Sequence, residues 1–198
     1  MRKDFIYLAS ASPRRRALLE QIGVPVQVRP AGVCESHHPE ESADDYVLRL
    51  ARAKADAVWG MLDDEQLRPV LAADTVVVMD QCLLGKPRNT SGALQMLTQL
   101  SGRSHRVLTG VAVRCGERLL SRLSTSEVRF RTTTAAERTA YCATGEPFDK
   151  AGGYAIQGLG AVFVEYLNGS YSSVMGLPLA ETVVLLKEFG FPTWLSSE

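Results

Sequence analysis

The feature that most constrains the fold is an apolar run rich in β-branched residues, PVLAADTVVVMD, at residues 69–80. Valine and threonine crowd the backbone of a helix but pack well on a pleated strand, so the run predicts a buried β-strand. Asp74 interrupts this run with one carboxylate. A buried carboxylate needs a cation, a metal ion or backbone N–H donors beside it. The run therefore predicts a sheet in which Asp74 has a specific partner.

Short apolar runs alternate with segments of helical periodicity along the chain, which is typical of the α/β class. We expect further strands in DFIYLA, VPVQVRP, HRVLTGVAVRCG, LLSRLSTSEVRFR and VFVEYLNG, and helices over about 13–23, 43–61, 91–102, 135–144 and 178–189. The expected N-caps are Ser12, Ser42, Thr90 or Ser91, and Thr134, with Asp45 and Glu137 completing two capping boxes. The 198 residues contain no repeat or clear linker, so we expect a single domain over 1–198 that has one core or two small lobes.

Charge and cysteine content exclude several classes of protein. The 22 basic residues equal the 22 acidic ones, whereas a general nucleic-acid binder shows a basic excess. Four cysteines lie far apart without a CxxC pair, which argues against a zinc site or a disulfide framework. No stretch approaches the roughly 20 apolar residues of a membrane span. We expect a cytoplasmic protein with neither a membrane nor a nucleic-acid partner, and a small anion remains compatible with a local cluster of cations.

Three arginines follow the predicted start of the first helix, in LASASPRRRALL. The partial positive charge of a helix N-terminus disfavours cations there by about 0.3–1 kcal/mol each. At 100° per residue, Arg15 falls on the apolar face, Arg14 at its edge and Arg16 on the opposite face beside Glu20. Arg16 is therefore expected in solvent. Arg14 and Arg15 need an anion, either an internal carboxylate or a phosphate bound at the helix start.

Lys54 projects into the apolar stripe of the second predicted helix, a stripe that also contains Val47, Leu50, Val58 and Met61. A lysine there either extends its ammonium to solvent or faces an anion. Asp74 likewise has two interpretations. It is a structural partner of a cation such as Lys54, or it is a catalytic or metal-binding carboxylate at a strand end, where α/β sites gather.

Two loop segments carry further polar candidates. Lys86 lies in GKP, which is not a phosphate-binding P-loop because the GxxxxGK[ST] pattern is absent. The glycine-rich segment DKAGGYAIQG contains Lys150 and Gln157, and such a loop can bring backbone donors close to a ligand. Gln157 offers the donor and acceptor needed to read a base edge. His37 and His38 are expected in a solvated loop, because adjacent histidines point apart in extended chain.

Cations in unusual places and two matching carboxylates suit a polyphosphate held with a divalent metal ion. The cations are Arg14, Arg15, Lys54, Lys86 and Lys150, and the carboxylates are Glu35 and Asp74.

Several of these segments, in this order, resemble the Maf family of nucleoside triphosphate pyrophosphatases. They are SASPRRRALL, GVCE with Glu35, RLARAKA, AADTVV, GKP, EPFDKAGGYAIQG and NGSYSSVMGLPL. The resemblance implies hydrolysis of a nucleoside triphosphate to the monophosphate and pyrophosphate. It implies an elongated mixed sheet flanked by helices, similar to inosine triphosphate pyrophosphatases, with two lobes around an active-site cleft. It also implies a divalent cation (Mg²⁺, Mn²⁺ or Co²⁺) and a homodimer.

The resemblance further implies roles for individual residues. Asp74 falls on the family's catalytic position, as proton acceptor or metal ligand, and Arg14, Thr75 and Gln157 fall on its specificity positions. These identities are similar to the branch that acts on dTTP and UTP. Glu35 and Asp74 would hold the metal, and the substrate would contact Ser10, Arg14, Arg15, Lys54, Thr75, Lys86, Lys150 and Gln157. The alternatives are a non-catalytic nucleotide-binding regulator of cell division and, with less support from the balanced charge, a sequence-independent nucleic-acid binder.

Overall fold

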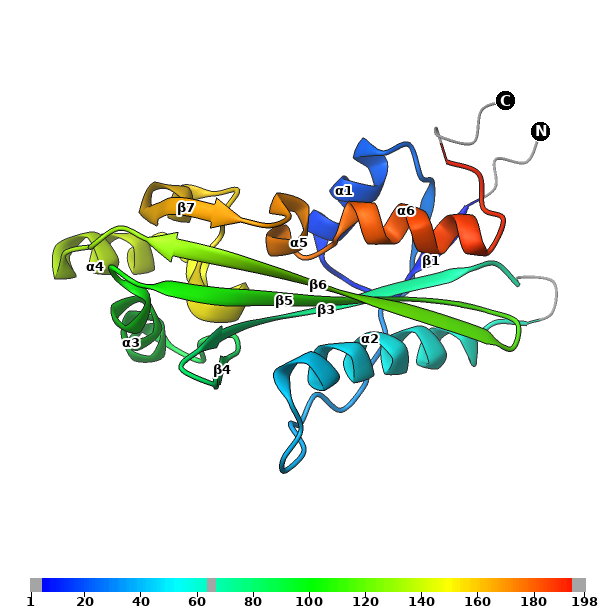
Figure 1. Ribbon diagram of the computed structural model, residues 1–198, viewed down its shortest axis with the longest axis horizontal. Coiled ribbons are helices and arrows are strands. Elements are labelled where there is room, and N and C mark those ends of the chain that lie inside the picture. Colours follow the sequence, from blue (N-terminus) through cyan, green and yellow to red (C-terminus); the bar gives the residue numbers. More distant parts are fainter. Residues whose placement is uncertain (1–4, 64–66, 194–198) are drawn as a thin grey trace. The chain divides into compact units, whose positions relative to one another are not determined.

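The computed structural model describes residues 5–63 and 67–193, which form a mixed β-sheet with flanking helices (Figure 1). The strands are β1 (Ile6–Leu8), β2 (Val26–Val28), β3 (Val70–Met79), β4 (Cys82–Leu84), β5 (Ser104–Cys115), β6 (Arg118–Phe130) and β7 (Val164–Asn168). The helices are α1 (Pro13–Gln21), α2 (Ala43–Trp59), α3 (Thr90–Leu100), α4 (Ala135–Ala143), α5 (Tyr171–Met175) and α6 (Leu179–Glu188). The predicted α/β class is confirmed. Asp4, in the first predicted strand, lies outside the described residues.

The strand order is β2-β1-β3-β5-β6-β7, with β4 paired to β3. β1 lies parallel to both β2 and β3, whereas β4 is antiparallel to β3 and β7 to β6. The sheet is therefore mixed, as predicted. The predicted buried run is β3, whose residues are buried throughout except for Thr75.

The chain divides into two compact units, and the boundary on β3 falls between Asp74 and Thr75. The first unit takes the described residues of Met1–Asp74, Thr109–Ser124 and Gly176–Glu198, and the second takes Thr75–Leu108 and Thr125–Met175. No helix in the two described segments is long and apolar enough to cross a membrane.

Small residues let α2 pack closely on the strands of the first unit (Figure 1). Ala51 and Ala55 of α2 lie in one buried cluster with Ala72 of β3 and Ala112 of β5. At Gly110 of β5, an added Cβ would come within 2.6 Å of a backbone oxygen of α2, so only glycine fits this contact. The close packing fixes the position of α2, which carries Lys54.

Aromatic side chains form much of the core of the second unit. Phe130, Tyr141, Tyr154 and Phe163 are all buried. Phe130 packs edge-on against Tyr154 with ring centroids 4.7 Å apart, and Tyr141 packs edge-on against Phe163 at 5.1 Å. Edge-to-face packing of this kind is favourable for aromatic quadrupoles.

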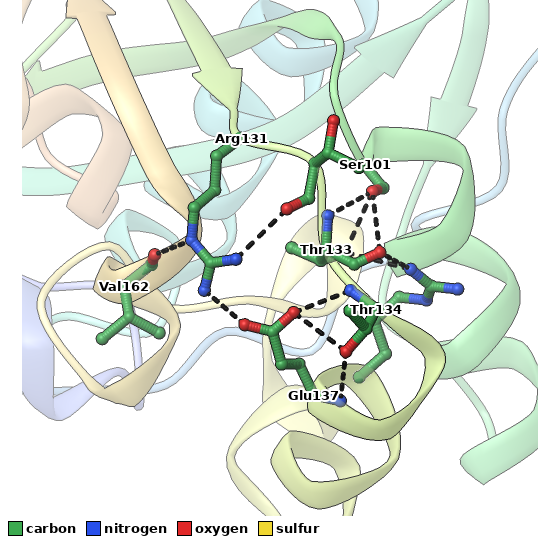
Figure 2. A network of polar contacts seen from close by, with 8 residues as sticks. Ser101, Arg131, Thr133, Thr134, Glu137 and Val162 are labelled. Atoms are coloured by element: carbon green, nitrogen blue, oxygen red, sulfur yellow. Dashed lines mark hydrogen bonds and ion pairs between the residues drawn. The ribbon is translucent and has the colours of Figure 1, made fainter.

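Two of the predicted helix starts are confirmed by their capping hydrogen bonds. The Ser42 hydroxyl accepts from the Asp45 N–H at 3.1 Å. The Asp45 carboxylate accepts from the Ser42 hydroxyl instead of its backbone N–H, so the capping box predicted for this pair is not formed. Thr134 and Glu137 form the predicted capping box, in which each side chain accepts from the other residue's backbone N–H (Figure 2). Figure 2 also shows Arg131 donating to Glu137 and to the Val162 carbonyl, which ties the end of β6 to this helix start.

Of the other two predicted caps, the one for α3 is corrected and the one for α1 is confirmed in position only. α3 is capped by Asn89, whose side-chain oxygen accepts from the Gly92 N–H at 2.9 Å, rather than by Thr90 or Ser91. Asparagine has a carbonyl oxygen that serves this role as well as a hydroxyl does. Ser12 occupies the N-cap position of α1, but its hydroxyl makes no capping hydrogen bond within the part of the chain that the structure describes.

Two further expectations are wrong in detail. α2 ends at Trp59, before Gly60, so Met61 lies beyond the helix and is 63% exposed rather than part of the apolar stripe. The chain in and around the glycine-rich segment is not an irregular loop throughout. It forms three short 3₁₀ turns, η2 (Glu146–Asp149), η3 (Ala151–Gly153) and η4 (Leu159–Phe163). Such turns leave no periodic apolar pattern in the sequence.

Candidate active site

The start of α1 turns one arginine inward and one outward, as the helical periodicity predicts. Arg15 donates from Nε to the Gly176 carbonyl at 2.7 Å and from a terminal nitrogen to the Ser10 hydroxyl at 3.1 Å. Arg16 is exposed and pairs with Glu20 one turn later at 2.7 Å. Ser10 is itself buried and also accepts from the Ser12 N–H at 3.2 Å. Ser10 and Arg15 therefore belong to one polar group.

Lys54 is the centre of a second polar group in the same unit. It is buried at 9% exposure, and its Nζ lies 2.6 Å from Asp74 Oδ1 and 2.5 Å from Glu35 Oε1. Asp74 is buried, whereas the side chain of Glu35 is about half exposed. The lysine thus faces anions instead of extending to solvent, and it links a buried carboxylate to a carboxylate that solvent can reach.

Electrostatic coupling joins the two groups. Burial lowers the pKa of Arg15, because desolvation disfavours the charged guanidinium. The carboxylates of Asp74 and Glu35 act in the opposite direction, and the positive charge of Arg14 lowers the pKa further. Three cations, Arg14, Arg15 and Lys54, lie with two carboxylates, so the cluster carries a formal excess of one positive charge. Such a cluster can attract an anion and orient it.

The position of Asp74 corrects one expectation. Asp74 is in the interior of β3 and not at the end of that strand. The neighbouring parallel strand does not extend to Asp74: the pairing of β1 with β3 reaches only Leu8 opposite Leu71. Asp74 therefore lies beyond the carboxyl end of β1, and there it contacts Lys54 of α2. The general rule that α/β sites form at strand ends therefore applies to β1 and not to β3, which carries Asp74.

The second unit brings two of the predicted loops together. The Gly152 N–H donates to the Gly85 carbonyl at 3.0 Å, so the loop of Lys86 lies against the turn that follows Lys150. Gly152 has a φ of +70°, and an added Cβ would lie 2.8 Å from a Val77 methyl group. Only glycine fits this junction without strain.

The remaining candidates differ in exposure. Lys86 and Gln157 are exposed, and Thr75 is half-buried. The Lys150 ammonium is held by its own chain, through the Glu146 carbonyl at 3.0 Å and the Asp149 carboxylate.

The histidines of the loop before α2 are exposed, as expected. His37 contacts the Glu41 carbonyl at 2.9 Å through Nε2, and His38 is also exposed. Within residues 5–63 and 67–193, no group of three or more His, Cys, Asp or Glu side chains is arranged to hold a metal ion.

One polar cluster was not found by sequence reasoning. Tyr141 and Glu146 bind each other at 2.7 Å and accept hydrogen bonds from the backbone around Gln157. The signal that could have indicated them is the pair of glycines, Gly158 and Gly160. Any larger residue at either position would clash with one of these two side chains.

A charged cluster beside a helix start and an internal carboxylate–lysine contact, in a mixed α/β fold, form a group of side chains suited to binding an anion such as phosphate. The family model described as "Maf-like protein" matches residues 5–189, and the chain belongs to the Maf family.

Relatives cover almost the whole chain. A protein of Chromobacterium violaceum named dTTP/UTP pyrophosphatase is 52% identical over 188 residues, which are 94% of this chain and 95% of that one. A protein of Alkalilimnicola ehrlichii with the same name is 56% identical over 190 residues, 94% of each chain. Among solved structures, the Ham1 protein of Staphylococcus aureus matches with a TM-score of 0.46 and 11% identity over 94% of this chain and 97% of that one.

Proposed function

We infer that this chain hydrolyses dTTP and UTP to the nucleoside monophosphate and pyrophosphate. The observation that carries the proposal is the contact of Lys54 with the buried Asp74 and the half-exposed Glu35, in a cluster that also includes Arg15, because carboxylates and cations suited to a phosphate group then lie together. The names of relatives that are more than half identical over nearly the whole chain support the same substrates.

The proposed reaction is an in-line displacement at the α-phosphorus. A water oxygen forms the new P–O bond while the bond from the α-phosphorus to the bridging oxygen breaks, and pyrophosphate leaves. Asp74 accepts the proton that water loses. Arg14, Arg15 and Lys54 stabilise the negative charge that develops on the phosphate oxygens, and Ser10 keeps the Arg15 guanidinium in place. Lys86 and Lys150 add further positive charge for the triphosphate.

The donor set fits a divalent cation (Mg²⁺, Mn²⁺ or Co²⁺). Glu35 and Asp74 direct carboxylate oxygens at the same Lys54 ammonium, and Mg²⁺ is commonly held by one or two carboxylates together with substrate phosphates. These two residues would hold the ion, which when bound neutralises phosphate charge.

Base recognition is assigned to Thr75 and Gln157. Gln157 is exposed on a fixed turn, and its amide can donate to a pyrimidine carbonyl while accepting from the ring N–H. The proposal includes the family's homodimer and a cytoplasmic location. The homodimer rests on the resemblance alone, and the cytoplasmic location also rests on the four scattered cysteines. Sedimentation velocity of the pure protein tests the homodimer.

A kinetic panel tests the proposed function. The pure protein is incubated with Mg²⁺ and dTTP, UTP, CTP, ITP or 7-methyl-GTP, and the pyrophosphate released is measured. We expect dTTP and UTP to give the highest kcat/KM values. Nucleotide binding without pyrophosphate release would instead indicate a non-catalytic regulator, and 7-methyl-GTP as the best substrate would contradict the roles of Thr75 and Gln157.

A further inference from the structure

The segment Ala155–Gly160 carries an exposed glutamine on a backbone that is otherwise well fixed. Gln157 is exposed, whereas Ala155, Ile156 and Gly160 are buried. Under the proposed function Gln157 reads the base, and the inference below rests on that function. One amide side chain discriminates between bases only if its backbone is held, because hydrogen bonds weaken steeply with distance and angle. The contacts that hold this backbone therefore affect base specificity.

Tyr141 of α4 holds the segment before Gln157. Its side chain is buried, and its hydroxyl accepts from the Ala155 N–H at 3.1 Å while donating to Glu146 Oε1 at 2.7 Å. Burial, and next the hydrogen bond to Glu146, raise the pKa of Tyr141, so the hydroxyl keeps its proton at neutral pH. The phenol thus connects the backbone of the segment to a carboxylate.

Glu146 holds the segment after Gln157. Its carboxylate accepts from the Leu159 N–H at 3.0 Å and from the Gly160 N–H at 3.0 Å, one with each oxygen. Burial acts to raise the pKa of Glu146, but the hydrogen bonds from Tyr141 and the two amides outweigh it, and the pKa is lowered. The carboxylate is therefore charged and accepts strongly.

The two glycines of the segment are the sites where these side chains come closest. A Cβ added at Gly158 would lie 2.3 Å from Glu146 Oε2, and one added at Gly160 would lie 2.7 Å from the Tyr141 hydroxyl. Glu146 also accepts at its backbone carbonyl from the Lys150 ammonium, 3.0 Å away. One residue thus positions both a candidate phosphate-binding cation and the backbone around Gln157.

We propose that Tyr141 and Glu146 are positioning residues for base specificity, which hold the backbone on both sides of Gln157 so that its amide meets the pyrimidine in one orientation. Neither residue touches the reacting atoms, so both act through Gln157. Loss of either side chain should therefore reduce discrimination between bases more than it lowers kcat.

The test compares Glu146→Gln and Tyr141→Phe with wild type. Glutamine keeps the size of Glu146 but replaces one acceptor with a donor that faces a backbone N–H, and phenylalanine removes only the hydroxyl. We expect KM for dTTP to rise about tenfold, while kcat stays within about threefold. The ratio of kcat/KM for dTTP to that for CTP and ITP should fall by about tenfold. Amide hydrogen exchange without nucleotide should become faster at Leu159 and Gly160.

Two control variants in the same unit separate positioning from stability. Asp80→Asn removes a carboxylate charge that pairs with Arg103 at 2.7 Å. Val128→Ala leaves a cavity at a fully buried position and lowers stability without touching these hydrogen bonds. Both controls should keep the wild-type substrate ratio.

Each remaining outcome is decisive. Wild-type substrate ratios in both Glu146→Gln and Tyr141→Phe would overturn the inference and leave the proposed function intact. An equal loss of discrimination in Val128→Ala would also overturn it, because the effect would then be one of general stability. A wild-type protein that cleaves no pyrimidine triphosphate would refute the proposed function, and the inference with it.

Discussion

Asp74 is the residue on which the proposed chemistry depends most directly. Asp74 is buried, and its carboxylate lies 2.6 Å from the Lys54 ammonium. Asp74→Asn keeps the shape and one acceptor for Lys54 but removes the base, so kcat should fall by about 10²- to 10⁴-fold. Pyrophosphate release measures this, with circular dichroism to verify folding.

Asp56→Asn is the matched control, since Asp56 pairs with Arg114 at 3.6 Å in the same unit. Near-normal turnover by Asp74→Asn would refute the assignment of Asp74 as the base.

The neighbouring arginines of α1 provide a second test at the scale of single residues. Arg15 is bound to Ser10 and Gly176, whereas Arg16 is exposed and pairs only locally with Glu20. Arg15→Gln should raise KM for dTTP by about 10- to 100-fold, because a charged hydrogen bond to phosphate is lost. Arg16→Gln should leave KM within about twofold, since an exposed pair contributes little. Equal effects of the two substitutions on KM would contradict the inward orientation of Arg15.

The junction of the Lys86 loop with η3 is an element whose geometry allows little change. At Gly152, alanine would meet Val77 at 2.8 Å and would also have to adopt a φ of +70°. Gly152→Ala should therefore lower the free energy of unfolding by about 2–4 kcal/mol. Gly116→Ala is the control, because Gly116 has a φ of +60° with nothing within 4 Å, and it should cost about 1 kcal/mol. Urea titrations measure both, and equal losses would show that contact with Val77 is unimportant.

At the same scale, the elements that sequence predicts well are those with local signals. α2 follows from its periodicity and from Ser42, and β3 follows from its β-branched residues. The cap of α3 was misplaced by one or two residues, because an asparagine and the hydroxyls after it offer similar acceptors. The turns η2, η3 and η4 escaped prediction because backbone hydrogen bonds and close contacts define them.

For the molecule as a whole, the sequence predicts those residues of the candidate site that are polar in an otherwise apolar helix face or strand. Lys54 in an apolar stripe and Asp74 in an apolar strand each need a partner, and the structure pairs them. The position of Asp74 relative to the end of the parallel strand β1 could not be predicted, because it depends on the register between the two strands. Tyr141 and Glu146 lay beyond sequence reasoning too, since their partners are backbone amides more than ten residues further along the chain.

The stability of the whole molecule should depend on pH through His105. This histidine is buried at 3% exposure, its Nε2 lies 2.8 Å from the Tyr154 hydroxyl, and its Nδ1 has no hydrogen-bond partner among the described residues. Burial lowers its pKa to about 4 from the ordinary 6.5. The unfolded chain therefore takes up the proton first, so the contribution to stability is complete above pH 6.5 and is lost as the pH falls towards 4.

Urea unfolding between pH 7 and pH 5 isolates this effect. Glu41 and Glu137, whose pKa values hydrogen bonds to Arg49 and Arg131 lower to about 2, lose their contributions only below about pH 4.5. Over this interval wild type should lose about 2 kcal/mol of unfolding free energy through His105. His105→Gln should start from a lower stability at pH 7 but lose much less on acidification. A variant with the same pH dependence as wild type would show that His105 is not the group responsible.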